Sequence, residues 1–116
     1  MRYLIIQTRM FSAKARLLQL TLEDVRAIEN DIMSDPEAWP VMAGTHGLRK
    51  MRFAPERGAG GKSGGLRVCY FYMDVHKHIY LMTAFAKNRQ ANLNAADRKA
   101  LGAVIAYIKA RSRQEP

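Results

Sequence analysis

The chain has 116 residues, 48% of them hydrophobic and 25% charged, and its 19 Lys and Arg outnumber its 10 Asp and Glu to give a net charge of +9. Such a composition is typical of a globular protein, and this length fits a single domain, residues 1–116, with a modest core. No apolar run is long enough for a membrane span or a secretory signal, which disfavours a membrane or secreted protein and indicates a soluble one in the cytoplasm.

The first third of the chain predicts a strand and two helices. Residues 3–7 are aromatic and β-branched, which favours a short strand, and residues 11–20 favour a helix. A second helix is predicted over residues 21–34, because Thr21 and Asp24 have the spacing of a capping box and apolar residues follow at helical spacing. A proline at position 36 ends this helix.

The remainder predicts three strands and a last helix. Residues 48–53 alternate between a mainly apolar and a mainly cationic side, as expected of a strand. Residues 66–73 and 79–85 are strand candidates joined by a short hairpin. Asn94 has the position of an N-cap for the last helix. The order of elements predicts a small α+β domain with a largely antiparallel sheet and its helices packed on one face.

The positive charge is unevenly distributed along the chain. Residues 1–43 carry five Lys and Arg against six Asp and Glu, a net of −1. Residues 44–90 carry nine against two, a net of +7, and residues 91–116 carry five against two, a net of +3. A nearly neutral third beside a strongly basic one indicates a site for a polyanion, and nucleic acid is the favoured one. A membrane surface fits less well, because no predicted helix combines a basic face with a broad aromatic one.

Cations from separate strands are expected to meet on one surface. Lys50 and Arg52 share a side of the strand over residues 48–53, Arg67 lies near the start of the next strand, and Lys87 follows the end of the last. Consecutive antiparallel strands are usually neighbours, so these side chains should converge. The cluster suits metal-independent cleavage of RNA by its own 2′-hydroxyl, in which arginine holds the charge on phosphorus and a lysine crowded by cations accepts a proton. Composition alone favours binding over cleavage.

Other chemistries find little support in the residues. There is no carboxylate pair, metal-ligand cluster or Ser-His-Asp arrangement, so we expect neither a metal nor a cofactor. Gly61, Lys62 and Ser63 match the end of a phosphate-binding loop, but its first glycine is missing and a strand follows. Cys69 is expected to be a buried, reduced thiol. The three histidines, His46, His76 and His78, are expected to be mainly structural. The same holds for the strand tyrosines Tyr70, Tyr72 and Tyr80, although one of these has the chemistry to stack on a base.

Several segments in order resemble the HigB-like branch of the RelE/ParE type II toxin superfamily. They are GLRKMRF (47–53), GKSGGLRV (61–68), YLMT (80–83), AKN (86–88) and LNAAD (93–97). The similarity extends over roughly residues 22–110, and the GKSGG run with its following arginine is its most specific part.

This resemblance implies a RelE-like domain and a toxin of a toxin–antitoxin system. Its activity would be that of a ribosome-dependent endoribonuclease (an mRNA interferase), which inhibits translation by cutting messenger RNA in the ribosomal A site. Its partners would be the ribosome, messenger RNA and a small cognate antitoxin of the helix-turn-helix, HigA-like kind. By position, the catalytic residues would be Lys50, Arg52, Arg67 and Lys87. The residues that contact RNA or the ribosome would be Arg49, Arg57, Lys62, Asn88 and Arg89.

Two other functions fit the same residues. The superfamily also contains ParE-like toxins that inhibit DNA gyrase and cut no RNA. The basic surface also fits a non-catalytic nucleic-acid-binding module, whose affinity would fall steeply with salt.

Overall fold

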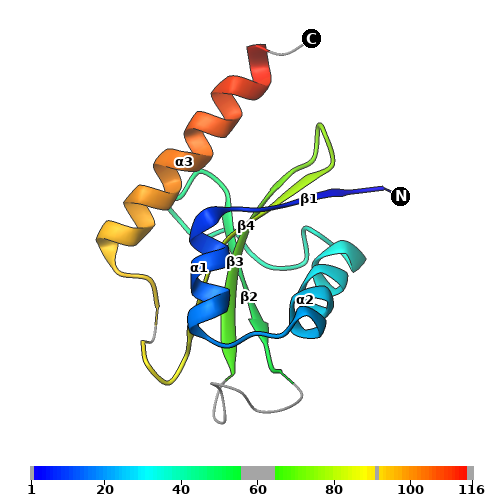
Figure 1. Cartoon of the computed structure of the whole chain (residues 1–116). Coiled ribbons are helices and arrows are strands. Elements are labelled where there is room, and N and C mark those ends of the chain that lie inside the picture. The colour runs from blue at the N-terminus through cyan, green and yellow to red at the C-terminus, as the bar shows by residue number, and fades with distance from the viewer. Residues whose placement is uncertain (1, 56–64, 91, 115–116) are drawn as a thin grey trace.

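A computed structural model describes residues 2–55, 65–90 and 92–114 of the chain. Its elements follow one another as β1 (Leu4–Gln7), α1 (Arg9–Leu17), α2 (Leu22–Ser34), β2 (Leu48–Phe53), β3 (Leu66–Met73), β4 (His78–Ala86) and α3 (Ala95–Gln114) (Figure 1). The elements therefore appear in the predicted order. The predictions for residues 57 and 62 lie outside the described residues.

The four strands form one sheet in the order β1-β4-β3-β2. The strands β2, β3 and β4 are antiparallel to their neighbours, whereas β1 runs parallel to β4. The predicted hairpin is confirmed, with Met73 opposite His78 and Lys77 at a φ of 60° in the turn. The sheet is thus mixed, with an antiparallel core of three strands.

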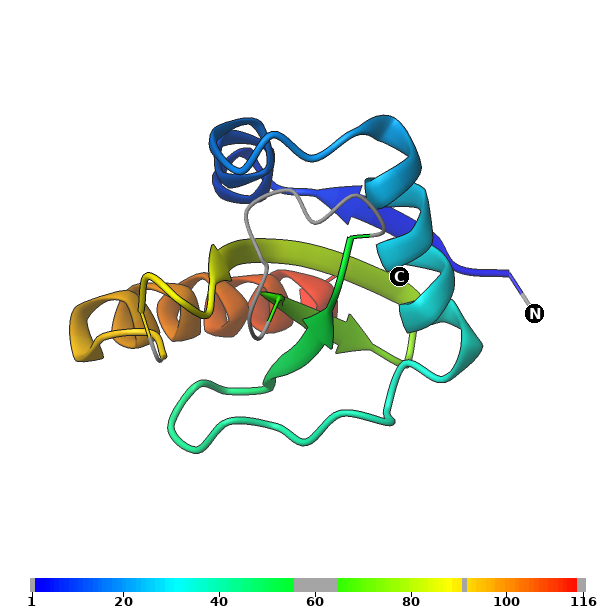
Figure 2. The ribbon, with the colours of Figure 1, turned by 90° about the horizontal axis from the view of Figure 1, so that it is seen from below.

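Helices cover both faces of this sheet. On one face Phe11 of α1 and Ile28 of α2 pack with a core that includes Met51 of β2. On the other face Leu101 and Ile105 of α3 pack with a second core. Figure 2 shows α1 and the start of α2 above the strands. The α+β class is confirmed, but the helices do not gather on one face as expected.

The residues of β4 explain why a second helical layer is needed. Every residue from Leu81 to Ala86 is buried, so this strand has no solvated face. Continuous apolar runs of this kind belong to strands that are covered on both sides. The predicted single layer of helices would have left one apolar face of β3 and β4 in water.

The two helix N-caps predicted from the sequence, at Thr21 and Asn94, are present in the structure. The Thr21 side chain accepts from the Asp24 backbone and the Asp24 carboxylate accepts from the Thr21 backbone, so the predicted capping box is present. At the start of α3, the Asn94 side chain accepts a hydrogen bond from the Asp97 backbone N–H at 2.7 Å. None of the helices in the described residues is long and apolar enough to cross a membrane.

The turn before β2 holds α3 close to the sheet. Thr45 is buried, and its hydroxyl donates to the Met42 carbonyl at 2.7 Å and accepts from the Leu48 N–H at 3.0 Å. A Cβ at Gly102 of α3 would lie only 3.4 Å from the Thr45 backbone. The helix therefore packs directly against the turn, next to the start of the basic strand β2.

Candidate active site

Three of the four predicted catalytic side chains stand on one face of the sheet. Arg52 of β2 lies directly opposite Arg67 of β3, and Lys50 lies opposite Cys69. Side chains of directly opposite residues project from the same face. The intervening Met51 faces the core under α1 and α2, so the cations belong to the face that α3 covers in part. Arg52 is exposed and Lys50 and Arg67 are half-buried.

Lys87 joins this group through the backbone at the start of β3. Its N–H donates to the carbonyl of Gly65 at 3.1 Å, beside the Leu66–Ala86 pair. Gly65 has a φ of 62°, and a Cβ there would lie 2.7 Å from the Phe53 carbonyl oxygen. Glycine thus allows the end of β2 to meet the start of β3, which brings Lys87, Arg67 and Arg52 to the same end of the sheet.

The side chain of Lys50 is also positioned by a hydrogen bond from outside the sheet. Its ammonium donates to the side-chain oxygen of Asn92 at 3.1 Å, in the segment between β4 and α3. The same oxygen accepts from the Leu93 N–H at 2.9 Å, which fixes the amide. Lys50 therefore has a defined position, although a lysine side chain is usually mobile.

Arg98 of α3 is a cation of this surface that sequence reasoning did not identify. The Cys69 thiol is buried, and burial raises its pKa from 9.0 to about 12, while the charges of Lys50 and Arg98 oppose that rise. Arg98 belongs to α3, which packs on the same face of the sheet as Cys69. Cys69 is a free, buried cysteine, as predicted, and its raised pKa keeps it protonated near neutral pH.

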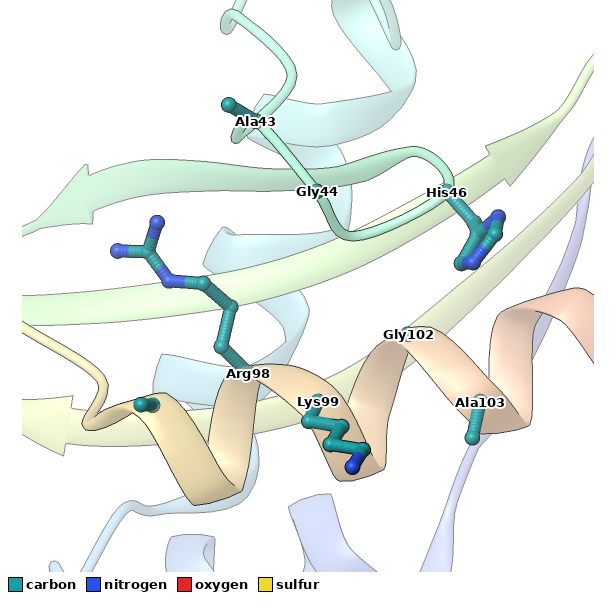
Figure 3. Close-up of a pocket in the computed structure, with 8 residues that line it drawn as sticks. Ala43, Gly44, His46, Arg98, Lys99, Gly102 and Ala103 are labelled. Carbon is teal, nitrogen blue, oxygen red and sulfur yellow. The ribbon is translucent and has the colours of Figure 1, made fainter.

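A cavity of about 410 Å³ lies between the first turns of α3 and the turn before β2. It is lined by Ala43, Gly44, His46, Ala95, Arg98, Lys99, Gly102 and Ala103. Figure 3 shows Arg98 extending from α3 toward the loop of Ala43 and Gly44, whereas Lys99 points to the other side of the helix. His46 has a φ of 64°, a conformation that non-glycine residues rarely adopt, and its ring lies beside Gly102.

The remaining predicted contact residues are not all near this cluster. Arg49 lies on the opposite side of β2, where its guanidinium donates to the Glu37 and Trp39 carbonyls and approaches the Glu37 carboxylate at 4.0 Å. Asn88 and Arg89 follow Lys87 in an exposed turn. Arg57 and Lys62 lie outside the described residues.

The tyrosines of the strands have structural roles. Tyr70 is fully buried, its hydroxyl donates to the Pro36 carbonyl at 2.8 Å, and burial raises its pKa to about 12. Tyr72 makes an edge contact with Tyr3, and Tyr80 stacks on Phe71. Tyr70 therefore has no surface to offer a nucleobase.

Within residues 2–55, 65–90 and 92–114, no group of three or more His, Cys, Asp or Glu side chains is arranged to hold a metal ion. The chemistry that these residues offer is that of guanidinium and ammonium groups. Two arginines directly opposite one another repel, and an anion between them relieves that repulsion. The surface is therefore suited to bind a phosphate group.

A signal for Arg98 was present in the sequence. Positions 98, 101 and 105 have helical spacing, so Arg98 belongs to the same stripe as Leu101 and Ile105, which face the sheet. The contact of Asn92 with Lys50 had no such signal, because it depends on the path of an irregular segment.

No protein-family model matches the chain. Solved structures with a similar fold include a mutant of the E. coli toxin RelE in the free state, with a TM-score of 0.53 and 14% identity over 78% of this chain and 90% of that one. The E. coli RelBE toxin–antitoxin complex gives 0.53 and 16% identity over 73% and 96%. A conserved hypothetical protein from Helicobacter pylori gives 0.53 and 14% over 75% and 97%. The chain therefore has a RelE-like fold.

Proposed function

We propose that the protein is the toxin of a type II toxin–antitoxin system and that it cleaves messenger RNA on the ribosome. The observation that carries this proposal is the cross-strand pair Arg52 and Arg67, with Lys50 and Lys87 at the same end of a RelE-like sheet. Within the superfamily, the sequence motifs favour the HigB-like branch.

The proposed reaction is attack of the RNA 2′-oxygen on the adjacent phosphorus. The new oxygen–phosphorus bond replaces the bond to the 5′-oxygen, so the products are a 2′,3′-cyclic phosphate and a 5′-hydroxyl end. Lys50 or Arg52 is assigned to the proton-abstraction step, Arg67 to the charge that develops on phosphorus, and Lys87 to protonation of the leaving oxygen. The step needs no metal, and its two proton transfers balance.

The hydrogen bond to Asn92 gives Lys50 a particular place in this scheme. A general base must lie within hydrogen-bond reach of the proton that it takes. The amide at 3.1 Å keeps the ammonium close to the sheet face that carries Arg52 and Arg67.

The proposed partners follow from the same fold. One of the similar solved structures is a toxin–antitoxin complex, and we propose that this chain is likewise neutralised by a cognate antitoxin, of the helix-turn-helix, HigA-like kind. Its other partners would be the ribosome and messenger RNA, which places it in the cytoplasm and away from membranes.

The decisive experiment maps new RNA ends in cells that express the chain. Two copies of one message are compared, one translated and one with its start codon removed. The proposal expects new 5′-hydroxyl ends on the translated copy only. Cuts on both copies would contradict dependence on the ribosome, and intact messages together with a DNA-damage response would indicate a gyrase inhibitor instead.

A further inference from the structure

A second pocket lies at the opposite end of the sheet from the candidate active site. It has a volume of about 220 Å³ and lies between the turn that joins β3 to β4 and the last turns of α3. The residues that give it its chemistry are His76, His78, Tyr80, Tyr107, Arg111 and Ser112. The nine residues of β4 separate this end of the sheet from Lys87, a distance of about 30 Å for a strand of that length.

Aromatic rings form a row along one side of this pocket. The His76 and His78 rings lie 5.4 Å apart with an interplanar angle of 32°, and the His78 and Tyr80 rings lie 6.2 Å apart at 71°. Tyr107 lies across from them on α3, and 63% of its surface is exposed. A tyrosine so exposed adds little to the core, and its ring remains available to a planar ligand.

The two walls of the pocket are joined to each other. The His76 Nε2 and the Ser112 hydroxyl lie 2.9 Å apart, in hydrogen-bond contact between the turn and the helix. This contact holds the turn against α3, so the ligand would meet a site that is already formed.

The charge around the pocket is positive. Among the described residues, its lining includes one cation, Arg111, and no carboxylate. Lys109 and Arg113 precede and follow it on α3 but line a neighbouring pocket, together with Asp74. The volume is below the roughly 300–1,000 Å³ usual for a drug-sized ligand, and it suits a single ring system with an attached anion.

We propose that this pocket binds one unpaired nucleotide of RNA, with its base against Tyr107 and the histidine rings and its phosphate on Arg111. Every base offers a π-face to an aromatic ring, and the guanidinium fork matches phosphate oxygens, so both parts of a nucleotide are accounted for. This inference rests on the proposed function only in that RNA is the ligand. It gives the protein a second RNA contact at a distance from the cleaved bond.

The test is an NMR titration of the full chain with a ten-nucleotide single-stranded RNA whose 2′-oxygens are methylated, so that it cannot be cut. The inference expects the backbone signals of His76, Tyr107 and Ser112 to shift, whether or not those of Arg52 and Arg67 shift as well. Tyr107→Ala and Arg111→Gln should each weaken binding at the pocket by about tenfold. Arg26→Gln, an equal loss of charge on exposed α2, should leave it unchanged.

The possible results separate this inference from the proposed function. Shifts confined to Arg52, Arg67 and Lys87 would overturn the inference and leave the proposed active site in place. Shifts confined to the pocket would support the inference and count against the active site. If a poly-glutamate peptide of equal charge bound the pocket as tightly as the RNA, the partner would be a protein and the inference would be overturned.

Discussion

At the scale of the residue, the candidate site is defined by charges that the fold forces together. Arg52 and Arg67 are direct cross-strand partners, and like charges in that position destabilise a sheet. A pair of this kind contributes nothing to the core, since Arg52 is exposed and Arg67 half-buried. A ligand with negative charge would relieve the repulsion between them.

Replacing Arg67 tests that account. If this arginine stabilises the charge on phosphorus, Arg67→Ala should lower the cleavage rate by about 10²–10³-fold and abolish growth arrest. The melting temperature should remain close to that of the wild type, because the change also removes the repulsion with Arg52. Arg67→Lys keeps the charge but loses the planar fork and should recover only part of the rate. A fully toxic Arg67→Ala chain would contradict the assignment.

The buried Cys69 thiol makes stability depend on pH in the alkaline range. Its pKa is about 12 in the folded state and 9.0 for the unperturbed group. Between these values the unfolded chain has lost this proton and the folded chain has kept it, so stability is full below pH 9 and falls as pH rises toward 12. The fall is at most about 1.4 kcal/mol per pH unit.

This dependence is measured by urea unfolding of the wild type and Cys69→Ala at pH 8, 9 and 10. The slope of the unfolding free energy between pH 9 and 10 should be smaller in the variant. Tyr70, whose pKa is also about 12, begins to contribute only above its ordinary value of 10.0. An identical slope in both proteins would show that the thiol is not protected by burial.

At the scale of the element, the junction of β2 and β3 depends on one glycine. Gly65 combines a φ of 62° with a backbone oxygen only 2.7 Å from where its Cβ would be. Gly44 has a φ of 74° but nothing within 4 Å of that point. The two positions therefore share the conformational requirement and differ in the space available.

Gly65→Ala and Gly44→Ala form a matched pair for this reason. Gly44→Ala should cost about 1–2 kcal/mol, the penalty for a left-handed residue with a Cβ. Gly65→Ala should cost clearly more, because the Phe53 carbonyl must also move, and it should lower cleavage by displacing Arg67. Chemical denaturation of both variants gives the comparison, and equal costs would show that the junction gives way easily.

The elements were predictable from sequence where a local cause exists. The capping box at Thr21 and the hairpin between β3 and β4 depend on residues close in the chain. The position of α3 was not predictable in this way. Its place on the second face depends on β4 being buried on both sides, which is a property of the assembled sheet. For the same reason strand alternation placed Lys50 and Arg52 on one face, and the order of the strands placed Arg67 beside them, whereas Arg98 and Asn92, which approach this surface from outside the strands, were missed.

At the scale of the whole molecule, charge is sorted by layer. The nearly neutral residues 1–43 include β1 and both helices that cover one face of the sheet. The basic remainder provides β2, β3, β4 and α3, and α3 covers the other face, from which Lys50, Arg52 and Arg67 project. A polyanion that approaches this molecule is therefore attracted to the side where the facing arginines lie.

This sorting predicts how RNA binding responds to salt. Each phosphate contact on single-stranded RNA contributes about 0.7 to the slope of log affinity against log salt. If Lys50, Arg67 and Lys87 each contact one phosphate, changing all three to glutamine should reduce that slope by about 2. The matched control changes Lys14, Arg16 and Arg26 to glutamine, three exposed cations of α1 and α2, and alters the net charge equally.

Fluorescence anisotropy with an uncleavable, 2′-O-methylated RNA at 50–300 mM salt measures both slopes. The control should keep the slope of the wild type, because long-range attraction is screened beyond about 10 Å at 0.1 M salt, whereas direct contacts are lost one by one. If both triple variants lowered the slope equally, binding would follow net charge alone, and the surface with Arg52 and Arg67 would have no special part in it. A reduction confined to the first variant is the outcome that a phosphate-binding active site requires.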